Sequence, residues 1–342
     1  MNYLKPATKS KRNDNDTYHF SIGEIKNFYS LRSLKVKPDD FHYQPVRGSP
    51  KLLSQILKLK DVRNNISENQ ICLTVGAKQG IAIAFDLLKN TVTTVIIPNP
   101  GWPPYKMLAT TNNLSIVFYD PAHATEIPSI VRNHPNSLLI LNYPHNPTGS
   151  VINKDQLSKI VDACILNNSW ILSDEVYVCL EPNHPSIIDF LAKYPRLIVV
   201  DSMSKSFAAA GLRLGYVFAP VDTINNFLDK IGISVSGTSS LSQSIAQNIL
   251  SEPSLQKKIV RRVFNDRTRL ADIITNAGYE IKSQGGPYLW VQGGPELYFH
   301  SKTILGLPGS VFGNPNFSRF CASSNPVGLC ELEQYYRLKV SQ

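Results

Sequence analysis

The stretch DSMSKSFAAAGLRLGY, residues 201–216, places Lys205 among small hydroxyl residues and Arg213 eight positions later between two glycines. A lysine amine whose pKa is lowered is a nucleophile toward aldehydes and forms a Schiff base with them. Arginine supplies a permanent charge and a fork of N–H donors that suits phosphate, and Ser202 and Ser204 add hydroxyl donors. A lone lysine in a loop is usually a surface residue, but this combination predicts a site that holds an aldehyde and a phosphate together.

The composition indicates a globular protein that is large enough for two domains. The chain has 342 residues, of which 42% are hydrophobic and 18% are charged, and these values are ordinary for a soluble protein. No apolar run approaches the roughly 20 residues that are needed to cross a bilayer. The polar N-terminal sequence lacks the apolar core of a signal peptide. We therefore expect a cytoplasmic protein with no membrane partner.

The charges and the cysteines argue against two other classes of protein. The net charge of +9 comes from basic residues spread along the chain, and the one dense cluster, KSKR at residues 9–12, is typical of a solvated arm. We therefore expect no nucleic-acid partner. The five cysteines are scattered, without a CxxC pair or another metal-ligand spacing. They predict reduced thiols and no bound metal.

Apolar stretches of strand length alternate with helical patterns between about residues 50 and 220. This alternation predicts an α/β fold with a mostly parallel sheet covered by helices. The helical patterns include residues 78–90 and 154–168, and the expected strands lie in 71–77, 94–100, 137–144, 170–177, 196–204 and 214–220. Because such sheets bind ligands beyond the carboxyl ends of their strands, the residues at those ends are the candidates for a site.

The sequence pattern changes after about residue 220, and the change predicts a second, smaller α+β domain. Long helical patterns come first, and YEIKSQGGPYLWVQG, residues 279–293, then indicates two strands around a glycine turn. We expect a large domain over residues 36–220 and a small domain over residues 221–342. Residues 1–35 are expected to form an arm that packs with the small domain.

The stretch TVGAKQG, residues 74–80, ends one expected strand and begins a helix. The backbone N–H groups of Gly76, Ala77 and Lys78 at this helix N-terminus can face a phosphate. A glycine turn of this kind is weak evidence by itself, but it strengthens the phosphate interpretation of Arg213.

Three further strand ends carry polar or aromatic residues. The motif SDEVY places Asp174 where a buried carboxylate can keep a ring nitrogen protonated, with Tyr177 as a nearby hydroxyl donor. NYPHNPTG offers Asn146 as a hydrogen-bond partner, and PNPGWPPY offers Trp102 for stacking on a flat ring. Each segment also has a plain structural explanation: an exposed acidic turn, a rigid proline turn and a core tryptophan.

Together these segments resemble the fold-type I pyridoxal-phosphate-dependent enzymes, and specifically the class I/II aminotransferase family. The shared features are S-x-x-K with an arginine eight residues later, and D-E-x-Y and N-x-P-x-N-P-T-G upstream of them. The resemblance implies pyridoxal 5′-phosphate as cofactor, with Lys205 as the Schiff-base lysine and proton-shuttling base. It implies that Asp174 pairs with the pyridine nitrogen, that Tyr177 and Asn146 bind the ring oxygen, and that Trp102 stacks on the ring.

The resemblance also implies a phosphate site and a quaternary structure. Tyr43, in HYQPVRGSPKLLSQIL, is similar to the family's residue in a segment that reaches into the neighbouring subunit. It would bind the partner's cofactor, which implies a homodimer with shared active sites. The phosphate would be held by Gly76, Ala77, Lys78, Ser202, Ser204 and Arg213.

The substrate site is expected to draw on both ends of the chain. HFSIGE, residues 19–24, is similar to the family's N-terminal segment, where Ile22 and Gly23 would line the substrate together with Asn146. Arg337, in YYRLKV, resembles the arginine that holds the substrate α-carboxylate through a two-pronged salt bridge. A bound carboxylate would orient the substrate toward the catalytic lysine.

The reaction implied by the resemblance is transamination between an amino acid and a 2-oxo acid. An amino acid displaces Lys205 from the cofactor aldehyde, Lys205 moves the α-proton, and a second 2-oxo acid reverses the sequence. Decarboxylation, β-elimination, cyclisation and oxidation remain open on the same cofactor site, as does a non-catalytic ligand-binding protein of the same fold. Residues 314–334 depart from the family pattern and only LKVSQ follows Arg337, so we expect a reduced small domain.

Overall fold

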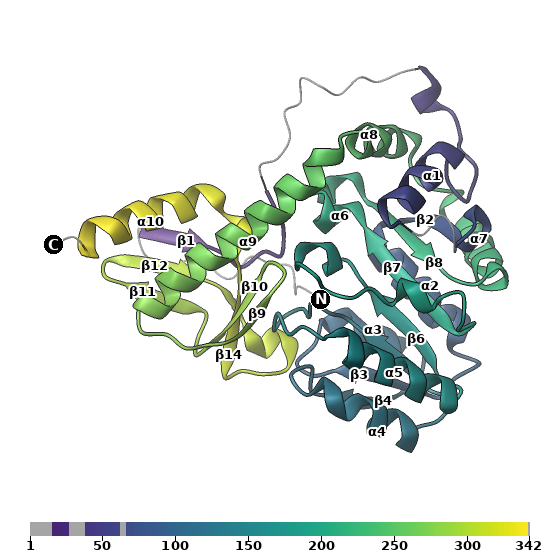
Figure 1. The fold of residues 1–342 in the computed structure, drawn as a ribbon, viewed down its shortest axis with the longest axis horizontal. Helices are drawn as coiled ribbons and strands as arrows, with labels where there is room; N and C mark the ends of the chain where they lie inside the picture. Colours follow the sequence, from purple (N-terminus) through teal and green to yellow (C-terminus); the bar gives the residue numbers. More distant parts are fainter. Residues whose placement is uncertain (1–15, 27–37, 62–65, 341–342) are drawn as a thin grey trace.

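The computed structural model describes residues 16–26, 38–61 and 66–340, and its largest sheet has seven strands in the order β2-β8-β7-β6-β5-β3-β4 (Figure 1). β8 runs antiparallel to both of its neighbours, and the other six strands are parallel to one another. The expected α/β fold with a mostly parallel sheet is confirmed. The apolar run SIVFY adds a strand, β4, at the sheet edge beyond the expected six. The strands are β2 (Ile71–Val75), β3 (Thr94–Pro98), β4 (Ser115–Tyr119), β5 (Leu138–Leu141), β6 (Trp170–Asp174), β7 (Leu197–Ser202) and β8 (Leu214–Phe218).

Helices cover both faces of this sheet, because successive strand side chains are buried on opposite sides. Leu139 and Leu141 of β5 pack into one apolar core, whereas Leu138 and Ile140 pack into the other. The first core includes α1 (Pro50–Leu59), α4 (Ile127–Asn133), α5 (Lys154–Leu166) and α8 (Ser240–Leu250), and the second includes α2 (Gly76–Leu88), α3 (Pro103–Thr111) and α7 (Val221–Val235).

The large domain extends further along the chain than the sequence pattern predicts. Ile224 and Phe227 of α7 are fully buried in the core beside α2, and Ala246 of α8 packs in the core beside α1. α9 (Pro253–Asn276) then leads into the small domain (Figure 1). The expected boundary at residue 221 is therefore corrected, because α7 and α8 bury their apolar faces against the large domain.

The small domain holds two short sheets covered by α9 and by α10 (Pro326–Val340). One sheet has the strand order β13-β14-β10-β9, and the other has the order β1-β12-β11. β1 pairs in parallel with β12, so this part of the N-terminal arm lies in the small domain, while residues 1–15 and 27–35 of the arm fall outside the described residues. The strands are β1 (Thr17–His19), β9 (Ile281–Gly285), β10 (Tyr288–Gln292), β11 (Glu296–Phe299), β12 (Lys302–Leu305), β13 (Leu307–Pro308) and β14 (Phe317–Cys321).

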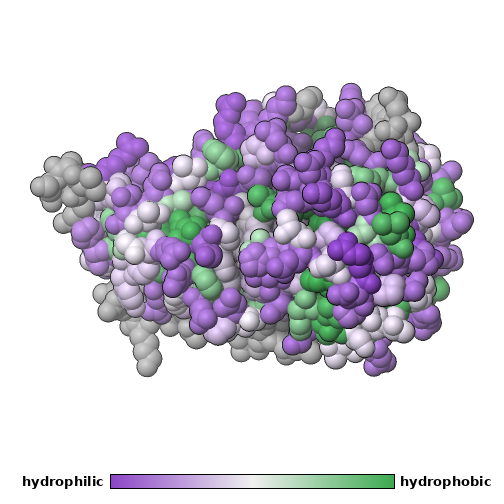
Figure 2. Space-filling view, turned by 60° about the horizontal axis from the view of Figure 1, so that its bottom comes forward, coloured by the Kyte–Doolittle hydropathy of each residue, from purple (hydrophilic) through white to green (hydrophobic). Residues whose placement is uncertain are grey.

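The surface is mixed in character. Figure 2 shows one face that is mostly hydrophilic, with small and separate hydrophobic areas. Scattered apolar side chains of this kind are normal on a folded protein. Among the helices in the described part of the chain, none combines the length and the apolar character that a membrane crossing requires.

Candidate active site

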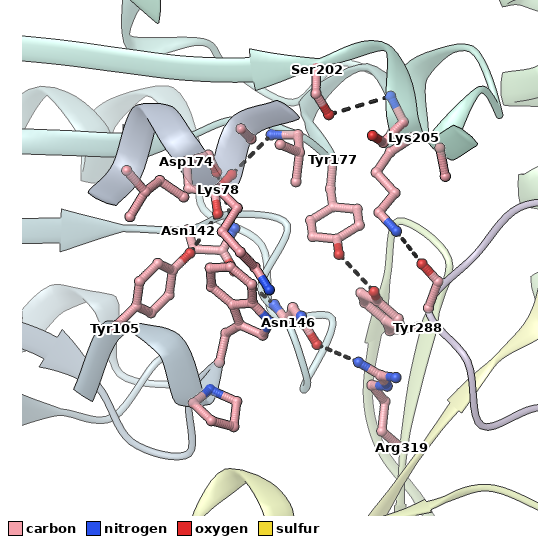
Figure 3. Close-up of a pocket in the computed structure, with 18 of the residues that line it drawn as sticks. Lys78, Tyr105, Asn142, Asn146, Asp174, Tyr177, Ser202, Lys205, Tyr288 and Arg319 are labelled. Carbon is pink, nitrogen blue, oxygen red and sulfur yellow. Dashed lines mark hydrogen bonds between the residues drawn. The ribbon is translucent and has the colours of Figure 1, made fainter. Parts of the chain in front are cut away.

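A cavity of about 350 Å³ lies where the carboxyl ends of the large sheet meet the small domain. Residues that follow β2, β3, β5, β6 and β7 line it, together with residues of β10, β14 and the N-terminal segment. Figure 3 shows several of these side chains pointing toward one another. The cavity brings together the sequence-predicted residues Ile22, Gly23, Ala77, Lys78, Trp102, Asn146, Asp174, Tyr177, Ser202, Ser204, Lys205 and Arg213.

One end of the cavity has the donors that an anion requires. α2 begins at Gly76, and its N-cap residue, Val75, makes no side-chain capping hydrogen bond. Ala77 and Lys78 in the first turn line the cavity, so the positive end of the helix lies beside it. Gly76 has a φ of 69°, and a Cβ there would lie 2.6 Å from a guanidinium nitrogen of Arg213. Glycine is therefore required for the close approach of arginine and helix.

Lys205 lies in α6 (Met203–Ser206), the short helical turn directly after β7. Ser202 begins this turn, because its hydroxyl accepts a hydrogen bond from the Ser204 N–H at 3.3 Å. The Lys205 amine donates a hydrogen bond to the Gly23 carbonyl (Figure 3). Removal from water lowers the pKa of Lys205, and this increases the fraction of the amine in the unprotonated, nucleophilic form.

Asp174, at the end of β6, is 5% exposed and forms part of the cavity wall. The Tyr105 hydroxyl donates a hydrogen bond to its Oδ2 at 2.6 Å, and Asn142 Nδ2 donates to its backbone carbonyl at 3.0 Å. Burial raises the pKa of Asp174 to about 6, although the hydrogen bond from Tyr105 acts in the opposite direction. The carboxyl group is thus held in place for a partner that can share a proton with it.

The raised pKa of Asp174 should make the stability of the cofactor-free protein depend on pH. The unfolded pKa of an aspartate is about 3.9, so between that value and about 6 the folded chain binds more protons and loses stability as pH rises. The loss amounts to roughly 3 kcal/mol. Asp174→Asn removes this titration while it keeps the shape of the side chain.

The variant should therefore gain that amount of unfolding free energy relative to the wild type between about pH 4 and pH 6. Urea unfolding of both cofactor-free proteins at several pH values measures the difference. A constant difference across this range would show that Asp174 titrates normally.

The opposite side of the cavity carries an arginine that the motifs do not indicate. Arg319, on β14, donates hydrogen bonds to Asn146 Oδ1 at 2.7 Å and to the Ser21 carbonyl at 2.8 Å. Its guanidinium carbon lies 4.7 Å from the ring centroid of Tyr288 and 4.9 Å from that of Phe312. Its Nε is buried and has no hydrogen-bond partner among the described residues. A buried cation with an unused donor is suited to an incoming anion.

The expectation for Arg337 is corrected by its position. Arg337 lies on α10 with a side chain that is 76% exposed, forms an ion pair with Glu333 at 2.9 Å, and does not line the cavity. α10 covers the outside of the small domain (Figure 1), whereas β14 pairs with β10 and β13 beside the cavity. Arg319, and not Arg337, therefore lines the cavity on the side of the small domain.

Two aromatic residues that the sequence singles out differ in their surroundings. Trp102 precedes α3 and lines the cavity, with its ring centroid 5.1 Å from that of Tyr105 and 5.2 Å from the Lys78 amine. Tyr43 does not line this cavity, and 93% of it is exposed. The exposed position leaves Tyr43 available to contact another chain.

The sequence motifs did not indicate four of the polar residues that line the cavity, and the sequence signals that could have indicated them differ. Tyr105 and Asn142 lie inside the motifs PNPGWPPY and NYPHNPTG, where attention to the neighbouring positions could have found them. Arg319 is a single charge within the apolar strand FSRFC, which is a usable signal for a buried functional cation. Tyr288 follows the glycine turn and has no signal of its own.

Comparison with known proteins identifies the family of the chain. The family model for aminotransferase class I and II matches residues 24–331. The chain belongs to this family. A probable N-acetyl-LL-diaminopimelate aminotransferase of Bacillus subtilis is 28% identical over 257 residues, which are 72% of this chain and 65% of that protein, slightly under two thirds of its length. An aspartate aminotransferase of Bacillus sp. (strain YM-2) is 30% identical over 81% of this chain and 78% of that protein.

Solved structures of other proteins show the same fold as this chain. An aromatic aminotransferase from Pyrococcus horikoshii has a TM-score of 0.80 at 22% identity, over 94% of this chain and 95% of that structure. The family assignment confirms the resemblance seen in the motifs and places the chain in a pyridoxal-phosphate-dependent family of fold type I. The cavity suits that cofactor, because an anion-binding end, a buried carboxyl group and a lysine amine meet in it.

Proposed function

We propose that this chain is a pyridoxal-phosphate-dependent aminotransferase that moves an amino group between an amino acid and a 2-oxo acid. The observation that carries the proposal is the convergence of the Lys205 amine, the Asp174 carboxyl group and the Arg213 guanidinium on one cavity. When bound, pyridoxal 5′-phosphate supplies an aldehyde that condenses with amines and a ring that withdraws electrons from the adjoining bonds. The protein supplies attachment, orientation and proton transfer.

Lys205 is the residue to which we assign covalent attachment and proton transfer. Its lowered pKa favours both roles, because the unprotonated amine is the nucleophile toward the aldehyde and is also the base. After an amino acid has displaced it, Lys205 Nζ takes the substrate α-proton. The contact with the Gly23 carbonyl holds the amine on the side where the N-terminal segment meets the cavity.

We assign the remaining cofactor contacts from the positions of the residues around the cavity. We assign the ring nitrogen to Asp174, whose carboxyl group is fixed by Tyr105, and ring stacking to Trp102. Tyr177 and Asn146 are assigned to the ring oxygen. The phosphate contacts are assigned to Gly76, Ala77, Lys78, Ser202, Ser204 and Arg213.

Arg319 is assigned to the α-carboxylate of the substrate. Asn146 and the ring of Tyr288 fix its guanidinium, and its Nε remains as a buried donor. A guanidinium binds a carboxylate through two parallel hydrogen bonds. Such a contact fixes the orientation of the amino acid relative to Lys205 and is expected to lower the entropic cost of reaching the reactive geometry.

Arg319→Gln should lower kcat/KM for the amino acid by about 10²- to 10³-fold, because a buried charge pair loses one partner. Most of the loss should be a rise in KM, since the contact is made before the chemical step. Arg337→Gln, which removes an exposed arginine of the same domain, should stay near the wild-type value. Steady-state kinetics of the three proteins measure the difference. A larger loss of kcat/KM in Arg337→Gln than in Arg319→Gln would instead assign the carboxylate contact to Arg337.

Product analysis tests the type of reaction. The cofactor-loaded protein is incubated with a panel of amino acids and with 2-oxoglutarate or pyruvate, and the products are identified by mass spectrometry. The panel should include aspartate, because several curated relatives are named aspartate aminotransferases. Transamination predicts equal amounts of a new 2-oxo acid and a new amino acid. Release of carbon dioxide or ammonia instead would assign another reaction, and no turnover would favour a ligand-binding protein.

We also propose a homodimer in which Tyr43 reaches the active site of the other subunit. Phe41 and Tyr43, just before α1, are 78% and 93% exposed. The carbonyl of His42 accepts a hydrogen bond from the Ser240 hydroxyl on α8, where the neighbouring Leu241 is also exposed. Exposed apolar side chains that gather in one place are typical of a protein interface. Analytical ultracentrifugation would contradict the proposal by showing a monomer throughout the micromolar range.

A cytoplasmic location is proposed as well. The five cysteines are all free in the structure, as is usual in a reducing compartment. Cell fractionation with an antibody against the chain would test it.

A further inference from the structure

A tyrosine with no role so far joins the two sides of the cavity. Tyr288 lies on β10 of the small domain and is 1% exposed. Its hydroxyl oxygen lies 2.7 Å from that of Tyr177, which follows β6 of the large domain. The Arg319 guanidinium lies 4.7 Å from the centroid of its ring. Figure 3 shows the three side chains in this sequence across the cavity.

The surrounding backbone holds Tyr288 in a fixed position. β10 is an inner strand of its sheet, paired with β9 on one side and with β14 on the other. The Tyr288 hydroxyl packs against Gly23 so closely that a Cβ on that glycine would lie 2.6 Å from the hydroxyl oxygen. The carbonyl of Gly23 in turn accepts the hydrogen bond from Lys205. The phenol is therefore held between the N-terminal segment and Tyr177.

Either hydroxyl can donate the hydrogen bond between the two tyrosines, but an anionic oxygen beside Tyr177 makes Tyr288 the donor. Burial raises the pKa of Tyr177 well above its usual range and that of Tyr288 to about 12, so both hydroxyls keep their protons near neutral pH. A hydrogen bond to an anion is stronger than one between neutral groups, and the Tyr177 proton therefore goes to the anion. Tyr288 then donates to the Tyr177 oxygen, and each bond in such a chain strengthens the next.

We propose that Tyr288 is a positioning residue that aims the Tyr177 hydroxyl at the ring oxygen of the cofactor and supports Arg319 for the substrate carboxylate. The inference rests on the proposed function. Tyr288, a side chain of the small domain, would then connect the end of the site that binds the ring oxygen with the end that binds the substrate carboxylate. Asn146, which accepts from Arg319 at 2.7 Å, forms a second and separate link between the same ends.

Two variants separate the hydroxyl from the ring of Tyr288. Tyr288→Phe removes the hydroxyl and keeps the ring beneath Arg319, whereas Tyr288→Leu removes both. A hydrogen-bond donor to the ring oxygen spreads the negative charge of that oxygen. The oxygen then holds less strongly the proton that it shares with the neighbouring Schiff-base nitrogen. Both variants should therefore move the pH midpoint of the visible absorption band of the pyridoxal-phosphate-loaded protein upward, on the order of half a pH unit.

The same variants should differ in substrate binding. Tyr288→Phe should keep KM for the amino acid within about twofold of the wild type, because the cation–π contact of Arg319 is retained. Tyr288→Leu should raise KM about tenfold. The affinity of the cofactor-free protein for pyridoxal 5′-phosphate, measured by absorbance titration, should fall by roughly threefold to tenfold in both.

Tyr119→Phe is the matched control. Tyr119 is also buried, and its hydroxyl donates to the Ile140 carbonyl at 3.0 Å, on strands outside the cavity. It should lose similar stability in thermal unfolding without any change in band midpoint, KM or cofactor affinity. The inference is overturned if Tyr288→Phe matches Tyr119→Phe in both midpoint and affinity. Should Tyr288→Leu fail to fold, the phenylalanine variant decides.

The two proposals fail in different ways. A wild-type protein that develops no visible band with pyridoxal 5′-phosphate would refute the proposed function itself. A band that is present in the wild type, together with an unchanged band midpoint and an unchanged cofactor affinity in Tyr288→Phe, would refute only the role of Tyr288.

Discussion

Replacing Lys205 by alanine is expected to lower the rate of amino transfer by at least about 10⁴-fold, because the nucleophile toward the aldehyde and the base for the α-proton are lost together. Pyridoxal 5′-phosphate should still bind non-covalently, since the anion-binding end of the cavity and Asp174 remain in place. Single-turnover kinetics measure the chemical step. Borohydride reduction followed by mass spectrometry should fix the cofactor on the wild-type chain and leave the variant unmodified.

Lys106→Ala is the matched control for this experiment. Lys106 is an exposed lysine on α3 that does not line the active-site cavity. The variant should retain both the rate and the borohydride adduct. An adduct that persists in Lys205→Ala, or one that is absent from the wild type, would show that another amine or no amine holds the cofactor.

Replacing Lys60 by methionine is expected to lower the free energy of unfolding by roughly 3–5 kcal/mol, because it leaves buried carboxylates without their cation. The Lys60 amine, at the end of α1, lies 2.5 Å from Asp201 Oδ2, and the two side chains are 14% and 2% exposed. Burial by itself would lower the pKa of Lys60, but Asp201 and Glu175 raise it above its usual value. The Tyr216 hydroxyl also donates to Asp201, at 3.0 Å. Urea unfolding of the cofactor-free protein measures the loss.

An exposed ion pair provides the comparison. Lys230 pairs with Asp86 at 2.7 Å, but the two side chains are 46% and 34% exposed, and Lys230→Met should cost less than about 1 kcal/mol. Adding Asp201→Asn to the Lys60 variant should recover part of the loss, because one uncompensated charge is removed. If Lys60→Met were no less stable than Lys230→Met, the buried pair would contribute nothing to the fold.

The part of the cavity that we assign to the cofactor could be located from the sequence, because each of its parts is a contiguous segment with its own local geometry. Lys205 and Arg213 belong to the short segment that connects the neighbouring strands β7 and β8. Gly76 lies where a strand passes directly into a helix, and Asp174 ends an apolar strand. Once alternation of strands and helices predicts a parallel sheet, the carboxyl ends of those strands must lie along one edge. Local pattern and sheet topology together therefore brought these residues to one place.

The domain boundary and the part of the cavity that we assign to the substrate were not predictable in this way. α7 has the same amphipathic pattern whichever domain it covers, and only packing assigns Ile224 and Phe227 to the core of the large domain. The sequence around Arg337, and not that around Arg319, resembles the family's segment with the carboxylate-binding arginine. However, α10 places Arg337 on the exposed surface, and the pairing of β14 with β10 brings Arg319 to the cavity.

The sequence by itself determined the fold class and predicted that the helix terminus at Gly76 and the amine of Lys205 belong to one site, because these features depend on residues that are close together in the chain. Only the tertiary structure decided that Arg319 and Tyr288 face the cavity and that Lys60 neutralises Asp201. Each of these contacts joins elements that are far apart in the sequence. Their formation depends on the packing of whole strands and helices, which no local pattern records.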